Sequence, residues 1–493
     1  MAEPLLVKAL REACESHGPR PALVSGDVAL SYEDLWCQAS ELAAQLRDEG
    51  VENAPVMVRC SNHPSDFVAF LGVWMAGGVV ASVHRTSPPE VVQALQAKAA
   101  CVVMVDGLAK PADKVQRLTG NAVPQHVLQD AALVIFTSGS TGQPKGVVLS
   151  HQAFAGKLTQ NQRLFQVNAE TTTLLVLNNT FSFGIWVALM TLLQGGRVVT
   201  LGRFTPQDFL SLLQHEAISF FGVVPTMVRA TFGTLTAAEL AQARTALQQT
   251  GRLKQVVIGG ESLGAALSAQ LREFIAPAEL FDVYGLTETS TSDFVLEPCD
   301  YAAHPDSIGK PFPGIAFRVI DGKGQPCPPG VTGELQLSTP YMMAGYLGDP
   351  ELTRQCFSEE GWFRTGDLAQ VDATGFVQVV GRLKELIVRG GNKITPMEVE
   401  LALLKCDGVA QAMVAGMPDP IMGQRIHALL IGKPGALLRP EALRHSLLQH
   451  LDRFKLPDTY YLGDTLPTGR TGKIDRGQLQ QWIATDVLQP LTD

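Results

Sequence analysis

Short apolar runs alternate with amphipathic stretches along most of the chain. Residues 79–83 are apolar and partly β-branched, which predicts a buried strand, and residues 101–105 repeat this pattern. Between them, Ser87 precedes Pro88 and Pro89, an order that is typical of a capped helix start. The pattern therefore predicts a strand, a helix and a second strand in succession.

The same order recurs further along the chain. Thr205 precedes Pro206, a helical pattern continues to about His215, and residues 219–224 form a strand-like apolar run. Parallel strands need long crossover connections, which helices usually supply. The alternation therefore predicts an α/β fold, with a large N-terminal domain of helix-covered, mostly parallel sheets.

The C-terminal part of the chain has a different pattern. Residues 409–415, 424–431 and 459–462 resemble strands, and residues 440–451 resemble a helix. Strands here outnumber helices, so the strict alternation is lost. This mixture predicts a small, separate α+β domain.

The boundary between the two parts lies in a charged segment. Residues 376–380 resemble a strand, and residues 381–385 (Gly-Arg-Leu-Lys-Glu) follow as a candidate linker. We therefore expect an N-terminal domain over residues 1–382 and a C-terminal domain over residues 383–493.

One apolar run is long enough to raise the question of a membrane span. It covers the 17 residues 67–83 and is interrupted by Gly72, Gly77 and Gly78, whereas a spanning helix needs about 20 apolar residues. We interpret it as a buried helix followed by a buried strand. The first residues of the chain also lack the apolar stretch of a secretory leader, so we expect a cytoplasmic protein with no membrane partner.

Composition narrows the possible functions. The 493-residue chain has 39 basic and 48 acidic residues, a net charge of −9. No basic stripe is visible, which argues against a nucleic-acid partner. The eight cysteines are scattered without a Cys-x-x-Cys pair, which excludes the usual zinc spacings and argues against a disulfide framework.

The strongest local signal is a glycine- and hydroxyl-rich loop that follows a strand-like run at residues 132–135. Residues 136–146 read Phe-Thr-Ser-Gly-Ser-Thr-Gly-Gln-Pro-Lys-Gly. Glycines let backbone N–H groups turn toward an anion, and hydroxyls add donors, so the loop predicts a phosphate site. It is not a Walker A loop, because no Ser or Thr follows Lys145. Taken alone, the segment also fits a surface loop of small residues.

Further motifs follow this loop in a fixed order. They read Gly-Gly-Glu-Ser-Leu at 259–263, Tyr-Gly-Leu-Thr-Glu-Thr at 284–289, Gly-Trp-Phe-Arg-Thr-Gly-Asp at 361–367, Gly-Arg at 381–382, Arg-Gly-Gly-Asn-Lys at 389–393 and Gly-Lys-Ile-Asp-Arg at 472–476. Together with the loop, they resemble the signature of the adenylate-forming superfamily, which includes acyl- and aryl-CoA synthetases, adenylation domains and luciferases. The resemblance spans nearly the whole chain and is strongest to a stand-alone acyl- or aryl-CoA ligase.

This resemblance implies a reaction in two halves. A carboxylic acid attacks the α-phosphate of ATP to give acyl-AMP and pyrophosphate, and a thiol then displaces AMP. The implied ATP-binding residues are Thr137, Ser138, Gly139, Ser140, Thr141, Gly142, Lys145, Gly260, Glu261, Tyr284, Gly285, Thr287, Asp367 and Arg382.

The resemblance also implies three catalytic residues. Glu288 would hold Mg²⁺, Thr287 would bind the α-phosphate, and Lys473 would contact both the acid and the α-phosphate. The C-terminal domain would swing between the half-reactions about a hinge at Lys384. Gly390 and Gly391 would then line the tunnel for the thiol.

The implied acid pocket is lined by Phe181, Ser182, Phe183, Trp186, Val224, Gly259 and Gly285. Amino-acid-activating relatives carry an aspartate where Ser182 stands, and a buried ammonium without that partner is costly. An α-amino acid is therefore disfavoured. The apolar and aromatic side chains favour an aryl, alicyclic or medium aliphatic monocarboxylate, although such side chains equally suit an ordinary core.

The thiol acceptor is expected to be coenzyme A. No serine follows Ser446, so we expect no fused carrier module, and a free-standing carrier protein is the alternative acceptor. A third interpretation is a non-catalytic nucleotide-binding homologue. Its expected sign would be the loss of site residues such as Lys145, Glu288 or Lys473, and all three are present.

Overall fold

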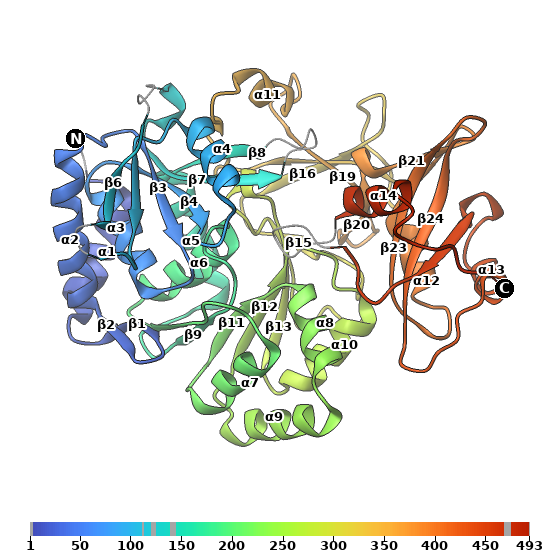
Figure 1. The fold of residues 1–493 in the computed structure, drawn as a ribbon, viewed down its shortest axis with the longest axis horizontal. Helices are drawn as coiled ribbons and strands as arrows, with labels where there is room; N and C mark the ends of the chain where they lie inside the picture. Colours follow the sequence, from blue (N-terminus) through green and yellow to red (C-terminus); the bar gives the residue numbers. More distant parts are fainter. Residues whose placement is uncertain (1–2, 111–112, 120–124, 139–143, 468–474, 493) are drawn as a thin grey trace. The chain divides into compact units, whose positions relative to one another are not determined.

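The computed structural model describes residues 3–110, 113–119, 125–138, 144–467 and 475–492. The chain folds as two compact units (Figure 1). The first unit contains Met1–Phe317 and Leu337–Phe363, and the second contains Arg318–Gln336 and Arg364–Asp493.

A nine-stranded sheet is the larger of the two sheets in the first unit, counted over the described residues. Its order is β15 (Lys310–Pro311), β14 (Phe294–Leu296), β13 (Glu279–Tyr284), β12 (Gln255–Gly259), β11 (Phe220–Val223), β9 (Thr172–Leu175), β10 (Arg197–Thr200), β1 (Pro21–Ser25) and β2 (Val28–Ser31). The strands from β13 to β1 are parallel, and antiparallel strands close both edges.

The second sheet of this unit has seven strands within the described part of the chain. Its order is β18 (Gly345–Tyr346), β8 (Pro144–Ser150), β7 (Ala131–Ser138), β4 (Val79–His84), β3 (Pro55–Cys60), β5 (Val103–Asp106) and β6 (Val115–Arg117). Strands β7, β4, β3 and β5 are parallel. Each sheet therefore presents the carboxyl ends of several parallel strands at one edge, where ligands bind in open α/β sheets.

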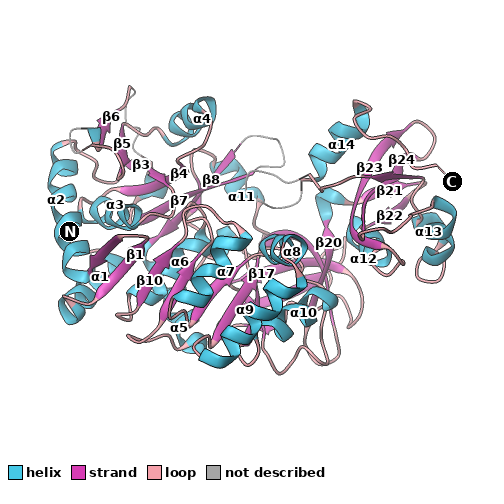
Figure 2. Cartoon of the chain, turned by 60° about the horizontal axis from the view of Figure 1, so that its bottom comes forward, coloured by secondary structure: helices cyan, strands magenta, loops and turns pink. Residues whose placement is uncertain are grey.

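Helices connect and cover these strands, as Figure 2 shows for α6, α7 and α9. They are α1 (Leu5–His17), α2 (Tyr32–Asp48), α3 (Pro64–Met75), α4 (Pro89–Ala99), α5 (His151–Phe165), α6 (Ser182–Leu192), α7 (Pro206–His215), α8 (Pro225–Thr234), α9 (Ala237–Thr250), α10 (Ala265–Ile275) and α11 (Pro350–Gln355). Helices α3 and α6 are buried around nearly their whole circumference. Helix α3 packs on strands of both sheets, and α5 links the seven-stranded sheet to α6 on the other.

These elements confirm most of the local predictions. Residues 67–83 form part of α3 and β4, and α7 covers Pro206–His215 with Thr205 accepting a hydrogen bond from Asp208 N. The predicted cap of α4 is wrong, because Pro88 occupies the N-cap position and no side chain caps this helix. Among the described residues, no helix combines the length and apolar character that crossing a membrane requires.

The second unit holds most of a four-stranded sheet and a further, five-stranded one, among the residues described there. The first contains β16 (Ala316–Ile320), β17 (Gly333–Ser338), β19 (Phe363–Val371) and β20 (Val377–Arg382). The second contains β22 (Asn392–Ile394), β21 (Ile387–Arg389), β24 (Gly423–Gly432), β23 (Val409–Asp419) and β25 (Thr459–Leu462), with helices α12 (Pro396–Leu403), α13 (Pro440–Leu447) and α14 (Arg476–Ala484).

The predicted α+β character of the C-terminal part is confirmed. The helix predicted over residues 440–451 is shorter, because α13 ends at Leu447. Residues 318–336 and 364–382 pack with the C-terminal residues in one compact unit. The proposed boundary after residue 382 separates a fixed part from a moving part. Packing alone does not test that movement, so the boundary stays a prediction.

Burial of His151 at the first residue of α5 gives the fold a pH dependence. Its side chain is 3% exposed, its ring packs edge-on against Trp74 at 5.8 Å, and Nδ1 has no hydrogen-bond partner among the described residues. Burial lowers the pKa of His151 to about 4. A histidine in the unfolded chain has a pKa of about 6.5, so the unfolded state binds the extra proton between these values.

We therefore predict that the stability linked to His151 is fully present above pH 6.5 and falls toward pH 4. His151→Phe should remove this pH-dependent contribution, which is on the order of 3 kcal/mol. The measurement is the thermal unfolding midpoint at pH 4.5 and pH 7.5. The exposed His450 provides the control variant His450→Phe, and equal pH dependence in His151→Phe and the native protein would contradict the prediction.

Candidate functional site

Five of the predicted site residues lie outside the described residues. They are Gly139, Ser140, Thr141 and Gly142 of the glycine-rich loop, and Lys473. The remaining predicted residues fall in both units, and the geometry of each unit is reported separately.

The described ends of the glycine-rich loop are held by an antiparallel pair of strands. Thr137 of β7 pairs with Lys145 of β8. Strand β8 also pairs with β18, and Lys145 Nζ lies 5.1 Å from the centroid of the Tyr346 ring. A cation over the face of an aromatic ring is favourable. This contact holds the lysine beside the predicted phosphate loop.

The Tyr346 side chain also joins Lys145 to the Thr-Glu motif, Thr287 and Glu288. Tyr346 Oη donates a hydrogen bond to Glu288 Oε1 at 2.7 Å, and Met343 N donates to the Glu288 carbonyl at 2.7 Å. Burial, followed by the Glu288 carboxylate, raises the pKa of Tyr346. The hydroxyl therefore stays protonated and serves as a donor to Glu288.

Two neighbouring parallel strands lead into the predicted ATP-binding residues Gly260 and Tyr284. Gly259 ends β12 in register with Val283 of β13, and Tyr284 is the last residue of β13. A Cβ atom at Gly259 would collide with the Val283 carbonyl oxygen, so a side chain there would separate the strands. The two predicted ATP-binding segments are thus neighbours at the carboxyl edge of the sheet.

The residues after these strands are held in place by specific contacts. Gly260 has a φ of 89°, which favours glycine. Glu261 forms an ion pair with Arg229 of α8, with Nη1 and Oε2 3.3 Å apart. The Tyr284 ring packs edge-on against Phe294 at 5.9 Å.

The predicted acid-pocket residues cluster at the start of α6. Phe181 is its N-cap residue and Ser182 its first residue. Phe183 stacks on Trp186 at 5.4 Å, and Trp186, which is fully buried, also stacks on Phe165. Val224 is the N-cap residue of α8. The aromatic side chains of Phe183, Trp186 and Phe165 therefore form one continuous stack.

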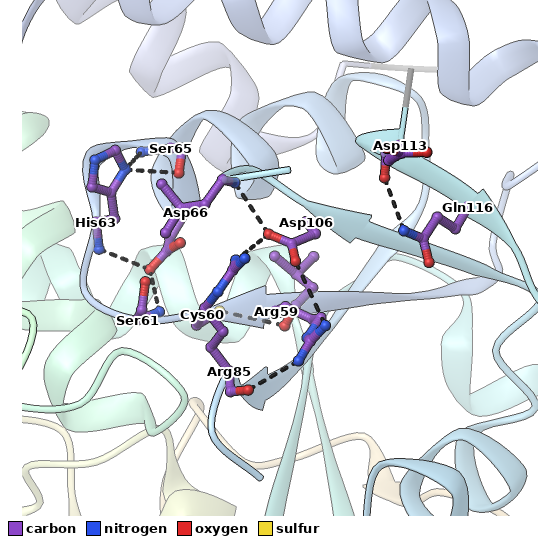
Figure 3. A network of polar contacts seen from close by, with 12 residues as sticks. Arg59, Cys60, Ser61, His63, Ser65, Asp66, Arg85, Asp106, Asp113 and Gln116 are labelled. Carbon is purple, nitrogen blue, oxygen red and sulfur yellow. Dashed lines mark hydrogen bonds and ion pairs between the residues drawn. The ribbon is translucent and has the colours of Figure 1, made fainter. Parts of the chain in front are cut away.

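A polar network that the sequence analysis missed supports the segment before α6. Asp66, which is 1% exposed, accepts hydrogen bonds from Ser61 N at 2.8 Å and His63 N at 3.0 Å (Figure 3). It also accepts from Asn179 Nδ2 at 3.0 Å, and Asn62 Oδ1 accepts from Asn179 N at 2.9 Å. Because Asn179 is far from Asp66 and Asn62 along the chain, no local pattern reveals these contacts.

Two predicted nucleotide-binding residues of the second unit lie together. Asp367 of β19 pairs in register with Arg382 of β20, and Arg382 Nε lies 2.9 Å from Asp367 Oδ1. The Asp367 side chain is 2% exposed and that of Arg382 is 47% exposed. The buried carboxylate is therefore paired with an arginine whose side chain is about half exposed.

The remaining predicted residues of this unit are exposed. Lys384 lies in the short 3₁₀ turn Leu383–Glu385, and Gly390 and Gly391, with φ of 54° and 83°, form the turn between β21 and β22. Arg476, the last residue of the Gly-Lys-Ile-Asp-Arg motif, bonds Glu400 through Nη1 at 2.6 Å and Glu385 through Nε at 3.0 Å. The end of this motif is thus anchored to Glu385 of the predicted hinge segment and to α12.

The carboxylate Glu288 fits the expected magnesium ion. Within the described ranges, no group of three or more His, Cys, Asp or Glu side chains could hold a metal by itself. Mg²⁺ is usually bound through one or two carboxylates together with substrate phosphates. A single Glu288 carboxylate near the predicted phosphate loop fits that pattern.

Comparison with known proteins decides the family. The sequence profile of the AMP-binding enzyme family matches residues 10–347, and that of the AMP-binding enzyme C-terminal domain matches residues 398–473. The chain belongs to the AMP-binding enzyme family. The predicted family, α/β fold class and ATP-dependent ligase class are confirmed.

Other proteins related to this chain resemble it over almost its full length. A feruloyl-CoA synthase from Amycolatopsis sp is 32% identical over 93% of this chain and 95% of its own. The fatty acid–[acyl-carrier-protein] ligase ScoC from Streptomyces coeruleorubidus is 29% identical over 93% of both chains. The crystal structure of ATP-bound MatB from Rhodopseudomonas palustris matches the fold with a TM-score of 0.85 at 24% identity, over 99% of this chain and 100% of that one.

The contact between Tyr346 and Glu288 leads to a prediction. Tyr346→Phe removes the hydroxyl that orients the Glu288 carboxylate, and a hydrogen bond to a charged group contributes about 1.5–3 kcal/mol. We expect the KM for Mg·ATP to rise about tenfold. Steady-state kinetics at varied Mg·ATP would measure this, with Tyr461→Phe of β25 as the control. An unchanged KM would show that the hydroxyl does not orient Glu288 for its ligand.

Proposed function

We propose that this protein activates a carboxylic acid with ATP to acyl-AMP and pyrophosphate, and then transfers the acyl group to coenzyme A. The observation that carries the proposal is the cluster of Lys145, Tyr346 and Glu288 beside the phosphate loop. A cation and a carboxylate contact the same tyrosine side chain, and binding a metal–triphosphate complex requires both kinds of charge.

The residues of the chain would act as follows. Lys145 and the glycine-rich loop would hold the β- and γ-phosphates, and Thr287 would donate to the α-phosphate. Tyr284 would stack on adenine, and Asp367 would accept from the ribose hydroxyls. Glu288 would hold Mg²⁺, which when bound neutralises phosphate charge.

Lys473 would align the two reactants of the first half-reaction. One cation that reaches the acid carboxylate and the α-phosphate offsets the repulsion between two anions. The hinge at Lys384 would then bring Gly390 and Gly391 to the thiol. The exposed positions of Lys384 and of both glycines support this role.

The proposed acid is an aryl, alicyclic or medium aliphatic monocarboxylate. The stack of Phe183 on Trp186 and the half-buried Phe181 and Val224 support an apolar pocket. The resemblance to a feruloyl-CoA synthase supports an aryl acid. A free-standing carrier protein is the second candidate acceptor, which the resemblance to ScoC favours.

The test is pyrophosphate release with Mg·ATP across a panel of aryl, alicyclic and aliphatic acids, with and without coenzyme A. Acid-dependent release with acyl-CoA formed on addition of coenzyme A would support the proposal. Acyl-AMP that accumulates despite coenzyme A would favour the carrier protein. Absence of release with every acid would contradict the proposed activity on these acid classes.

Lys473 gives a sharper prediction, because it would act in one half-reaction only. Lys473→Ala should lower acyl-AMP formation by about a hundredfold or more, while conversion of supplied acyl-AMP to thioester stays largely intact. The two half-reactions are measured separately, with Lys433→Ala as the control for loss of a C-terminal lysine. Equal loss of rate in both half-reactions would contradict the assignment of Lys473 to the first half-reaction.

A further inference from the structure

A fully buried ion pair lies between α5 and the segment that follows the Thr-Glu motif. Lys157 and Asp293 are both 0% exposed, and Lys157 Nζ lies 3.0 Å from Asp293 Oδ1. Removing two charges from water is expensive, and a buried pair often contributes little net stability compared with apolar side chains. The pair therefore calls for an explanation other than stability alone.

The contacts of the pair reach both ends of one short segment. Lys157 Nζ also donates to the Ser292 carbonyl at 3.0 Å and lies 4.9 Å from the Tyr341 ring centroid. Asp293 Oδ2 accepts from Thr289 Oγ1, and Asp293 N donates to the Tyr284 carbonyl at 2.6 Å. The ion pair thus fastens the segment from the end of β13 to the start of β14.

This segment has an unfavourable backbone. Ser290, Thr291 and Ser292 have φ values of 60°, 69° and 55°. This left-handed region is unfavourable for residues other than glycine, and it is usually occupied by single residues rather than by runs. Three in succession persist only when surrounding contacts determine the conformation.

The hydroxyls of these residues connect the segment to its surroundings. Ser290 Oγ donates to the Tyr341 carbonyl at 2.8 Å, and Ser292 Oγ donates to Asn161 Oδ1 at 3.0 Å. Thr291 Oγ1 donates to Ser182 Oγ at 2.7 Å. The left-handed residues 290–292 therefore follow Glu288 closely within the segment, and Thr291 contacts Ser182, the first residue of α6.

We propose that Lys157, through Asp293, is a positioning residue that holds this left-handed segment and so fixes Glu288 and Ser182 relative to each other. The inference rests on the proposed function, in which Glu288 serves the nucleotide and Ser182 the acid. One buried pair thereby aligns the two reactants' sites. Loss of the ion pair therefore weakens the binding of both Mg·ATP and the acid, rather than of one of them.

The test replaces both charges without leaving either one unpaired. The double variant Lys157→Met/Asp293→Asn keeps the volumes and the acceptor for Thr289, so its thermal midpoint should stay near that of the native protein. The KM values for Mg·ATP and for the acid should each rise about tenfold. By contrast, Tyr346→Phe should raise only the KM for Mg·ATP.

A matched control removes another ion pair of the same unit. Arg197 and Glu216 are joined at 2.8 Å from Nη2 to Oε2, far along the chain from the segment. Arg197→Met/Glu216→Gln should leave both KM values within about twofold of those of the native enzyme. If the Lys157 double variant also keeps both KM values within that range, the proposal is overturned.

Two further measurements keep the test decisive. If the Lys157→Met/Asp293→Asn variant does not fold, Lys157→Gln/Asp293→Asn also leaves no charge unpaired, and its glutamine amide can still donate to the Ser292 carbonyl. It should raise both KM values about threefold, and unchanged values would refute the proposal. Calorimetric binding of Mg·ATP needs no turnover. If the native protein activates no acid, the proposed function fails, whereas a loss of Mg·ATP affinity of about tenfold in the double variant still supports the role of Lys157.

Discussion

The burial of helices α3, α5 and α6 against the two sheets of the first unit organises the rest of this unit. Helices α3 and α6 are apolar on nearly every face, and such helices need partners all round. Strands from both sheets supply these partners around α3. Because the helices fix the sheets, they also fix where the carboxyl ends of the parallel strands lie, and the candidate site is built from those ends.

The candidate site combines rigid strands with irregular connections. Gly259 and Tyr284 end neighbouring parallel strands, so their positions follow directly from sheet register. Glu288 and Ser182 lie beyond strand ends and depend on side-chain contacts instead. Tyr346 donates a hydrogen bond to the Glu288 carboxylate, and Thr291 donates one to Ser182. The precision of the site thus depends on a few polar contacts that a stable sheet alone would not provide.

Local patterns predicted the elements and motifs well, because caps and periodicity act over a few residues. Thr205 caps α7 as expected, whereas Ser87 does not cap α4, because that helix begins one residue later, at Pro89. Contacts between distant residues left no local signal. Tyr346 and Glu288 are 58 residues apart, and Lys157 and Asp293 are 136 apart. The sequence therefore predicted the family residues but not the residues that orient them.

The two glycines of the predicted acid pocket, Gly259 and Gly285, leave no room for a side chain. A Cβ atom at Gly285 would collide with Ser292 N, and one at Gly259 would meet the Val283 carbonyl. Both clashes are with backbone, which cannot rotate away as a side chain can. Under the proposed function, new acid specificity would therefore arise on α6 and α8, at positions such as Phe183 and Val224, while both glycines stay constant.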